Sequence, residues 1–186
     1  MSRTLEVRDN ETGLSVPVKL GESYSVSVED LAKVYVEDGK TYLGGFINLA
    51  VATTATEPLG IAINTTVLSL HAFTRAAAGG DAVVSLYEDV TYSGGTPITL
   101  VNRNRISPVV LHPVVLTRTP AITTSGTLLA QSLIVGGRTP VFSVGGASSD
   151  EYGWFLKPNT KYVLTVNNTA AGAEPVYVGV VILNKT

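Results

Sequence analysis

Few side chains in this sequence are suited to acid–base or metal chemistry, and those few are scattered. The two histidines, His71 and His112, stand in the apolar, strand-like runs "VLSLHAF" and "VVLHPVV". A metal centre would need a third ligand and supporting hydrogen bonds, and no residue at metal-ligand spacing supplies them. A lone histidine in an apolar strand is typical of a structural residue. We therefore predict no metal site and no catalytic histidine.

Adjacent carboxylates are the second candidate for chemistry. Four such pairs occur in the sequence: Glu29-Asp30, Glu37-Asp38, Glu88-Asp89 and Asp150-Glu151. Neighbouring acids on an extended strand point to opposite faces, so none of these pairs makes a ready general acid/base dyad. A Ca²⁺ site built from loop carboxylates and carbonyls stays open as an alternative.

Motifs for covalent or phosphate chemistry are also missing from the sequence. The absence of cysteine excludes disulfides, thiolate ligands and cysteine nucleophiles. Five Gly-Gly pairs lack the spacing of a phosphate-binding or dinucleotide-binding loop, and there is no "GxSxG" elbow. The sequence therefore predicts a protein that is not an enzyme and uses no cofactor.

The segment "LVNRNR", residues 100–105, concentrates polar groups directly after an apolar run. In an extended strand, Asn102 and Asn104 would point to one face, and Arg103 and Arg105 to the other. A row of arginines needs acceptors, which can come from this chain, a sister subunit or a partner. Within the chain, Glu88 is a plausible neighbour of Arg103 across one hairpin, with Asp89 beside it.

Composition restricts the partners. Charged residues make up 15% of the 186 residues and hydrophobic ones 45%, whereas globular domains carry about 25% charged residues. Such a surface is explained by a Thr/Ser/Asn-rich β protein, or by cover from identical subunits or a larger assembly. A net charge of −2 gives no overall attraction to nucleic acid or anionic membranes, and neither is an expected partner. The sequence has no secretory h-region and no apolar run of about 18 residues, which predicts a soluble protein made in a cytosol.

The elements that position these residues are predicted to be strands. Eight to ten short β-branched or alternating runs are separated by Gly, Pro, Asn and Ser turns, and no helix of three turns is convincing. Turns are predicted at Asp38-Gly39, at 157–160, and as a hairpin-type turn at Gly94-Gly95. The C-terminal run "PVYVGVVIL" is apolar on both faces, which favours a central, doubly covered strand or a subunit seam.

These patterns predict an all-β, jelly-roll-like β-sandwich with an N-terminal arm. The expected boundaries are an arm over residues 1–20 and a single sandwich domain over residues 21–186. Pro113 inside an apolar run indicates an edge strand, a bulge or a break.

Two strings resemble the decoration (cement or auxiliary capsid) proteins of tailed-bacteriophage heads. The first is "SLYEDVTYSGGTPITLVNRNRIS", residues 85–107, and His71 matches a histidine that precedes it. The second comprises Trp154, Leu156, Pro158, Thr160, Lys161, Tyr162, Leu164, Val166 and Asn167. The resemblance covers residues 65–170, and departs from the family in the insert "SLIVGGRTPVFSVGGASSDEYG" and in the N-terminal arm.

The resemblance implies a non-enzymatic virion protein, made in the host bacterial cytoplasm, that lies on the outside of a bacteriophage head. Such a protein cements neighbouring major capsid subunits and assembles as a homo-oligomer, most often a homotrimer. In that role Asn102, Arg103, Asn104 and Arg105 are the candidate capsid or subunit contacts, because arginine binds carboxylates and carbonyls in a bidentate manner.

Two other classes of protein are alternatives for the same fold. A trimeric receptor- or carbohydrate-binding tip of a phage tail fibre would use exposed aromatics, for which the candidates are Tyr87, Tyr92, Tyr152 and Trp154, the last more typical of core. The sequence has none of the stalk repeats expected next to such a tip. A cupin-type enzyme on the same fold would need a histidine cluster.

Overall fold

The computed structural model describes residues 4–8, 15–19, 36–64, 70–106, 114–135 and 153–184. The chain divides into two units, Met1–Lys33 and Val34–Thr186. In the first unit, β1 (Thr4–Arg8) and β2 (Ser15–Lys19) pair antiparallel. The arm boundary predicted at residue 20 lies outside the described residues, as do His112, Pro113, Tyr152 and the Glu29-Asp30 and Asp150-Glu151 pairs.

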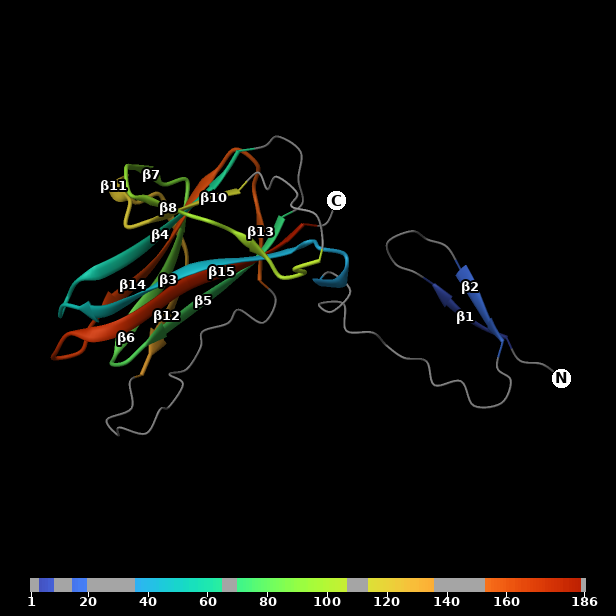
Figure 1. Cartoon of the computed structure of the whole chain (residues 1–186), viewed down its shortest axis with the longest axis horizontal. Helices are drawn as coiled ribbons and strands as arrows, with labels where there is room; N and C mark the ends of the chain where they lie inside the picture. The colour runs from blue at the N-terminus through green and yellow to red at the C-terminus, as the bar shows by residue number, and fades with distance from the viewer. Residues whose placement is uncertain are drawn as a thin grey trace. The chain divides into compact units, whose positions relative to one another are not determined.

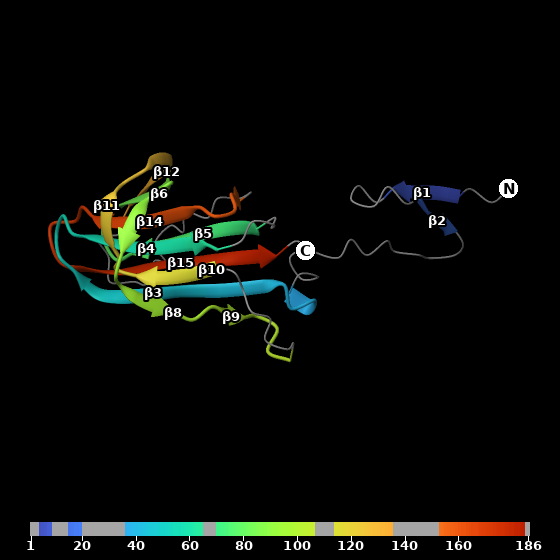
Figure 2. The ribbon, with the colours of Figure 1, turned by 90° about the horizontal axis from the view of Figure 1, so that it is seen from above.

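Two antiparallel sheets make up most of the second unit (Figures 1 and 2). The six-stranded sheet has the order β12 (Thr127–Ile134), β6 (Ala82–Glu88), β14 (Lys161–Asn168), β4 (Thr56–Ile63), β10 (Val114–Arg118), β8 (Thr96–Ile98). The five-stranded sheet has the order β13 (Trp154–Leu156), β5 (Leu70–Ala78), β15 (Glu174–Asn184), β3 (Thr41–Val51), β9 (Val101–Asn102). The predicted all-β sandwich is confirmed.

The alternation of side chains explains why the two sheets stack. In β5, "LHAFTRAAA", Leu70 and Ala72 are buried, whereas His71 and Arg75 point to the other face. One continuous core joins Val178 and Ile182 of the five-stranded sheet to Leu59 and Leu164 of the six-stranded sheet. Burial of a large aliphatic side chain stabilises the folded state by about 1.5–3 kcal/mol, so this core supplies the main driving force for stacking.

The pairing pattern follows one simple rule. Eight of the eleven strands in the two sheets follow this rule, and their chain order is β3, β4, β5, β6, β12, β13, β14, β15. The first of them pairs with the eighth, the second with the seventh, the third with the sixth and the fourth with the fifth. The chain is therefore arranged as one long hairpin that is rolled into two layers. In it β15 is the central strand of its sheet, as the sequence indicates.

The turn at Gly94-Gly95 departs from the prediction. Both glycines have positive φ values, 63° and 86°, as a tight turn requires. The flanking strands nevertheless do not pair with each other: β7 (Thr91–Ser93) pairs with β11 (Ala121–Thr124), and β8 pairs with β10. The hairpin prediction was wrong because the turn moves the chain from one sheet to another. The turns at Asp38-Gly39 and at 157–160 are present.

The small β7–β11 sheet covers part of the outer face of the six-stranded sheet. Tyr92 of β7 is 8% exposed and packs with Val90 on Val163, which is fully buried. The Tyr92 ring also lies against Gly60, where a side chain would meet its atoms at 2.8–3.0 Å. We call β7 and β11 the flap. Tyr92 is the side chain that packs the flap against the six-stranded sheet.

Candidate functional site

The Asn-Arg segment lies at an edge of the five-stranded sheet, where β9 pairs with β3. The strand ends after Asn102, so the alternation expected over residues 100–105 does not continue. The Asn102 amide donates to the Gly39 carbonyl (2.8 Å), and its oxygen accepts from the Asn104 backbone N–H (2.9 Å). The Asn104 amide donates to the Glu37 carbonyl (2.7 Å), and its oxygen accepts from the Ile106 N–H (3.0 Å). Both asparagines thus satisfy backbone groups at a strand end.

Arg103 and Arg105 are both exposed at this edge. The Arg103 backbone N–H donates to the Thr41 carbonyl (2.9 Å), which continues the pairing with β3. Among the described residues, no side chain forms an ion pair with either guanidinium.

Glu88 does not face Arg103, which corrects the internal pairing considered above. It belongs to β6, which pairs with β12 and β14 in the other sheet. Its carboxylate accepts from Lys157 Nζ (2.6 Å) and from the Tyr162 hydroxyl (3.0 Å). The hydrogen bond from Lys157 is the main cause that lowers the pKa of Glu88. Asp89 has a positive φ of 59° at the end of the same strand.

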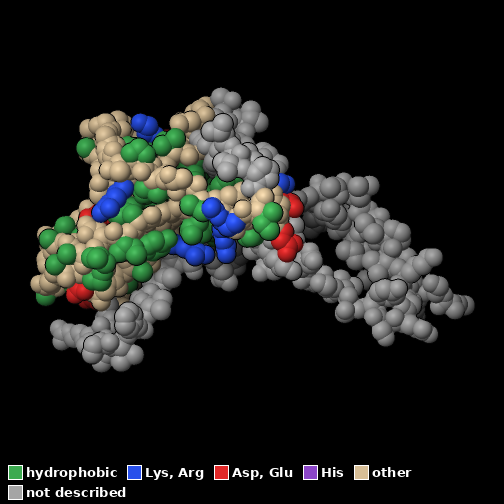
Figure 3. All heavy atoms as spheres, in the orientation of Figure 1, with side chains coloured by type: hydrophobic (Ala, Val, Ile, Leu, Met, Phe, Trp, Pro, Cys, Tyr) green, Lys and Arg blue, Asp and Glu red, His purple; other side chains and the backbone are tan. Residues whose placement is uncertain are grey.

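The outer face of the five-stranded sheet is largely apolar, although Arg75 of β5 is an exposed charged side chain within it. Register places Phe73, Val181, Leu43 and Val101 in one row across β5, β15, β3 and β9. Ile47 is 58% exposed on the same face of β3. Figure 3 shows hydrophobic side chains along the surface over β3 and β15, with Lys and Arg side chains beside them.

The neighbouring row of this face carries the one described histidine. Phe155 of β13 stands opposite His71 of β5, and Leu183 stands on the other side of His71. The His71 and Phe155 rings stack at 4.6 Å with an angle of 2° between their planes, although Phe155 is 63% exposed. The Phe73 ring lies 4.5 Å from His71. His71 therefore packs within an aromatic cluster, as a structural residue does.

We use the name apolar face for the exposed hydrophobic side chains on this outer side of the five-stranded sheet. Its five exposed members are Leu43, Ile47, Leu49, Val101 and Phe155. Sequence reasoning missed this face, because register across four strands creates it and each strand alone reads as ordinary core. One sequence feature could have predicted this face: the run "PVYVGVVIL" is apolar on both of its sides, which indicated that the outer side is covered as well.

The outer face of the six-stranded sheet carries a cavity of about 220 Å³ next to the flap. Tyr87 lines it, so one of the four aromatics proposed for a receptor-binding tip borders an open site. Tyr92 belongs to the flap, and its side chain is buried against the six-stranded sheet. This burial raises the pKa of Tyr92 to about 12. Trp154 packs against the core, as the sequence suggested.

Other site types are not found in the part of the chain that the structure describes. No three His, Cys, Asp or Glu side chains lie close enough together there to share a metal ion. The described residues also contain no helix with the length and apolar character needed to span a bilayer.

Comparison with known proteins gives no relative on which to base a function. No family model matches the chain, and neither a curated protein nor a solved structure matches it.

Proposed function

We propose that this chain is a structural protein that binds the outer surface of a bacteriophage head and cements neighbouring major capsid subunits. The apolar face is the observation that carries the proposal. Monomeric proteins rarely expose large contiguous apolar patches, and such patches mark interaction sites. The two sequence strings that resemble decoration proteins supply the identity of the partner, the major capsid protein.

The sandwich belongs to the jelly-roll type in this proposal. The support is the pairing of first with last, second with seventh, third with sixth and fourth with fifth strand. A jelly roll is a double sheet of eight strands wound in this way. Bridging two capsid subunits requires a rigid surface of sufficient area and complementarity, and it requires no chemical step. A β-sandwich is a scaffold of this kind.

The contact surface combines two neighbouring features. The apolar face supplies buried area, and Arg103 and Arg105 at its β9 edge supply charged donors for carboxylates of a capsid subunit. Val101 belongs to the apolar row, and it is two residues from Arg103. Arginine next to an apolar centre is a typical composition of protein interfaces.

Co-sedimentation with phage heads tests this proposal. Heads assembled from the major capsid protein of the same genome are incubated with the wild-type chain, with Leu49→Thr/Ile47→Thr and with Arg103→Ala/Arg105→Ala. We expect the wild type to sediment with heads and both variants to bind at least about tenfold more weakly. Thr123→Ala, on the flap, is the matched control and should bind like the wild type. Wild-type protein that stays in the supernatant would contradict the proposal.

The second candidate function is a receptor- or carbohydrate-binding tip of a tail fibre. The cavity beside Tyr87 favours it, because an aromatic side chain next to uncharged polar groups is suited to a sugar. Binding to host cells without binding to heads would favour this candidate over decoration.

A further inference from the structure

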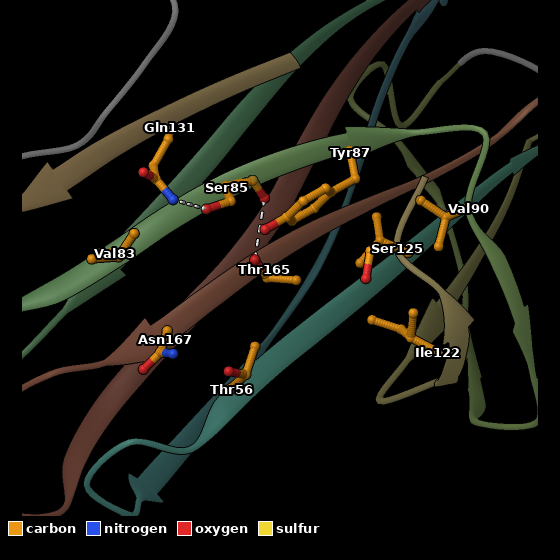
Figure 4. Close-up of a pocket in the computed structure, with 11 residues that line it drawn as sticks. Thr56, Val83, Ser85, Tyr87, Val90, Ile122, Ser125, Gln131, Thr165 and Asn167 are labelled. Carbon is orange, nitrogen blue, oxygen red and sulfur yellow. Dashed lines mark hydrogen bonds between the residues drawn. The ribbon is translucent and has the colours of Figure 1, made fainter. Parts of the chain in front are cut away.

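The cavity on the six-stranded sheet lies between the flap and side chains of four neighbouring strands, β12, β6, β14 and β4. Val83, Ser85 and Tyr87 come from β6, and Thr165 and Asn167 from β14. Figure 4 shows these side chains around a common space, with Ile122 and Ser125 of the flap region on its other side. The floor is thus built on paired strands, which hold side chains more rigidly than loops.

Among the described residues that line the cavity, the phenol of Tyr87 is the only ionisable group. The polar lining consists of hydroxyls and amides: Thr56, Ser85, Ser125, Gln131, Thr165 and Asn167. Such groups donate and accept hydrogen bonds without carrying a charge. A ligand matched to them is neutral and carries several groups that also both donate and accept.

Two hydrogen bonds fix part of this polar lining in advance. Gln131 Nε2 donates to Ser85 Oγ (3.1 Å), and Thr165 Oγ1 donates to the Ser85 carbonyl (3.3 Å) (Figure 4). The Ser85 hydroxyl therefore keeps its own hydrogen for another acceptor, and the Thr165 oxygen keeps its lone pairs for a donor. The Gln131, Ser85 and Thr165 side chains are therefore held in place before a ligand binds.

Asn167 provides the observation that points to a missing partner. Its Oδ1 atom is buried and has no hydrogen-bond partner. Register places Asn167 between Thr56 of β4 and Val83 of β6, which both line the cavity. A buried amide oxygen without a donor is unfavourable, so a rotation of the Asn167 side chain that brings this oxygen to a ligand hydroxyl in the cavity would satisfy it.

The remaining lining is apolar. Tyr87 offers a ring, and Val83, Val90, Ile122 and Val163 add aliphatic surface. A sugar ring has hydroxyls at its rim and C–H groups on its faces, so it matches a lining of this mixed type. The cavity volume is below the roughly 300–1,000 Å³ typical of sites for drug-sized ligands, and it equals about seven waters at ~30 Å³ each. One sugar ring is therefore a suitable occupant and an oligosaccharide chain is not.

We propose that this cavity binds a single neutral pyranose ring. The ring hydroxyls bond to Asn167, Ser85, Gln131 and Thr165, and one C–H face packs on Tyr87. The inference gives a site to the second candidate function, and it does not depend on attachment to a head. The ring can come from a free monosaccharide or from the terminal unit of a surface glycan.

Calorimetric titration with a sugar panel tests the proposal. The panel contains glucose, galactose, mannose and N-acetylglucosamine, the methyl glycoside of each, and glucuronate. We expect at least one neutral sugar to bind with a Kd of about 1 mM, and glucuronate to bind at least about tenfold more weakly. If the methyl glycoside binds as well as the free sugar, the linked carbon faces solvent and the source is a terminal glycan unit. If only the free sugar binds, the source is a monosaccharide.

Variants locate the binding site. Asn167→Ala and, separately, the exposed Gln131→Ala should each weaken binding about tenfold, since each removes a hydrogen bond to the ring. Asn64→Ala, at an exposed asparagine outside the lining, is the matched control and should leave the Kd unchanged. Thermal unfolding checks that each variant is folded.

Three results would overturn the proposal. The first is the absence of saturable heat with every neutral sugar at about 100 mM, which means that water alone fills the cavity. The second is tighter binding of glucuronate than of neutral sugars. The third is a Kd that neither Asn167→Ala nor Gln131→Ala changes. None of these results bears on co-sedimentation with heads, so this proposal and the decoration proposal fail separately.

Discussion

At the scale of single residues, the Asn-Arg segment separates a folding role from a contact role. Asn102 and Asn104 make four hydrogen bonds to backbone groups between them. Arg103 and Arg105 are exposed. The asparagines therefore shape the strand end, and the arginines remain the proposed contact residues.

The first prediction compares these two pairs. Asn102→Ala should lower the free energy of unfolding by about 1–2 kcal/mol, because the Gly39 carbonyl and the Asn104 N–H lose a partner. Arg103→Ala/Arg105→Ala should change it by less than about 0.5 kcal/mol, as is usual for exposed sites. Urea unfolding measures both. A double arginine variant that is less stable than Asn102→Ala would assign the arginines to the fold.

The second prediction concerns Glu88 and acid stability. Its folded-state pKa is lowered, so the unfolded state binds more protons as the pH falls. The stabilisation is present above the ordinary pKa of 4.5 and is lost as the pH falls through the lower folded-state value. Glu88→Gln should therefore be less stable than the wild type at pH 7, and the difference should shrink below about pH 4.5. Urea unfolding across pH 3–7 measures it, and a difference that stays constant would exclude this role.

At the scale of elements, the flap depends on a close approach to a glycine. Tyr92 lies on Gly60, and Lys161 Nζ stands 4.8 Å from the centre of the Tyr92 ring. Any side chain at position 60 must displace that ring, because its Cβ would lie 2.8–3.0 Å from the ring atoms.

The third prediction follows from this contact. Gly60→Ala should destabilise the fold by about 1–3 kcal/mol through overpacking. It should also return the Tyr92 pKa from about 12 towards its usual value near 10, because the ring becomes exposed. Thermal unfolding and ultraviolet titration of the tyrosines measure the two effects. Gly172→Ala is the control, since a side chain there meets nothing within 4 Å, and equal effects in both variants would refute the flap contact.

The elements also show what the sequence could and could not predict. The β-branched and alternating runs predicted an all-β fold correctly, since a two-residue period is a local property. The pairing of β7 with β11 was not predictable, because strand partners are chosen by packing between distant segments. The same limit applies to Glu88: its true partner, Lys157, lies 69 residues away in sequence. The cavity and the apolar face both arise from such distant pairing, so the sequence predicted neither.

At the scale of the whole molecule, the two outer faces of the sandwich differ in chemistry. The five-stranded sheet presents the apolar face, and the six-stranded sheet presents the cavity and the flap. A surface attached through the apolar face would leave the cavity exposed on the opposite side. Attachment and sugar binding are therefore compatible in one molecule.

The fourth prediction concerns assembly. The low fraction of charged residues and the resemblance to decoration proteins predict a homo-oligomer, most often a trimer, and an exposed apolar face favours association. Light scattering should give about three times the chain mass of 19.5 kDa. Leu49→Thr/Ile47→Thr should shift the mass towards that of a single chain if the apolar face joins the copies. A wild-type mass of one chain at micromolar concentration would contradict the prediction.

The rolled hairpin has a consequence for the order of synthesis. Strand β3 is made before every other strand of the sandwich, yet its main partner, β15, is made last. The ribosome must therefore release nearly the whole polypeptide before the five-stranded sheet can form. Until then, an unpaired edge of β3 is exposed to other nascent chains. Pairings so distant in sequence are slow to form, on the order of milliseconds to seconds, so newly made copies will be most prone to aggregation in that interval.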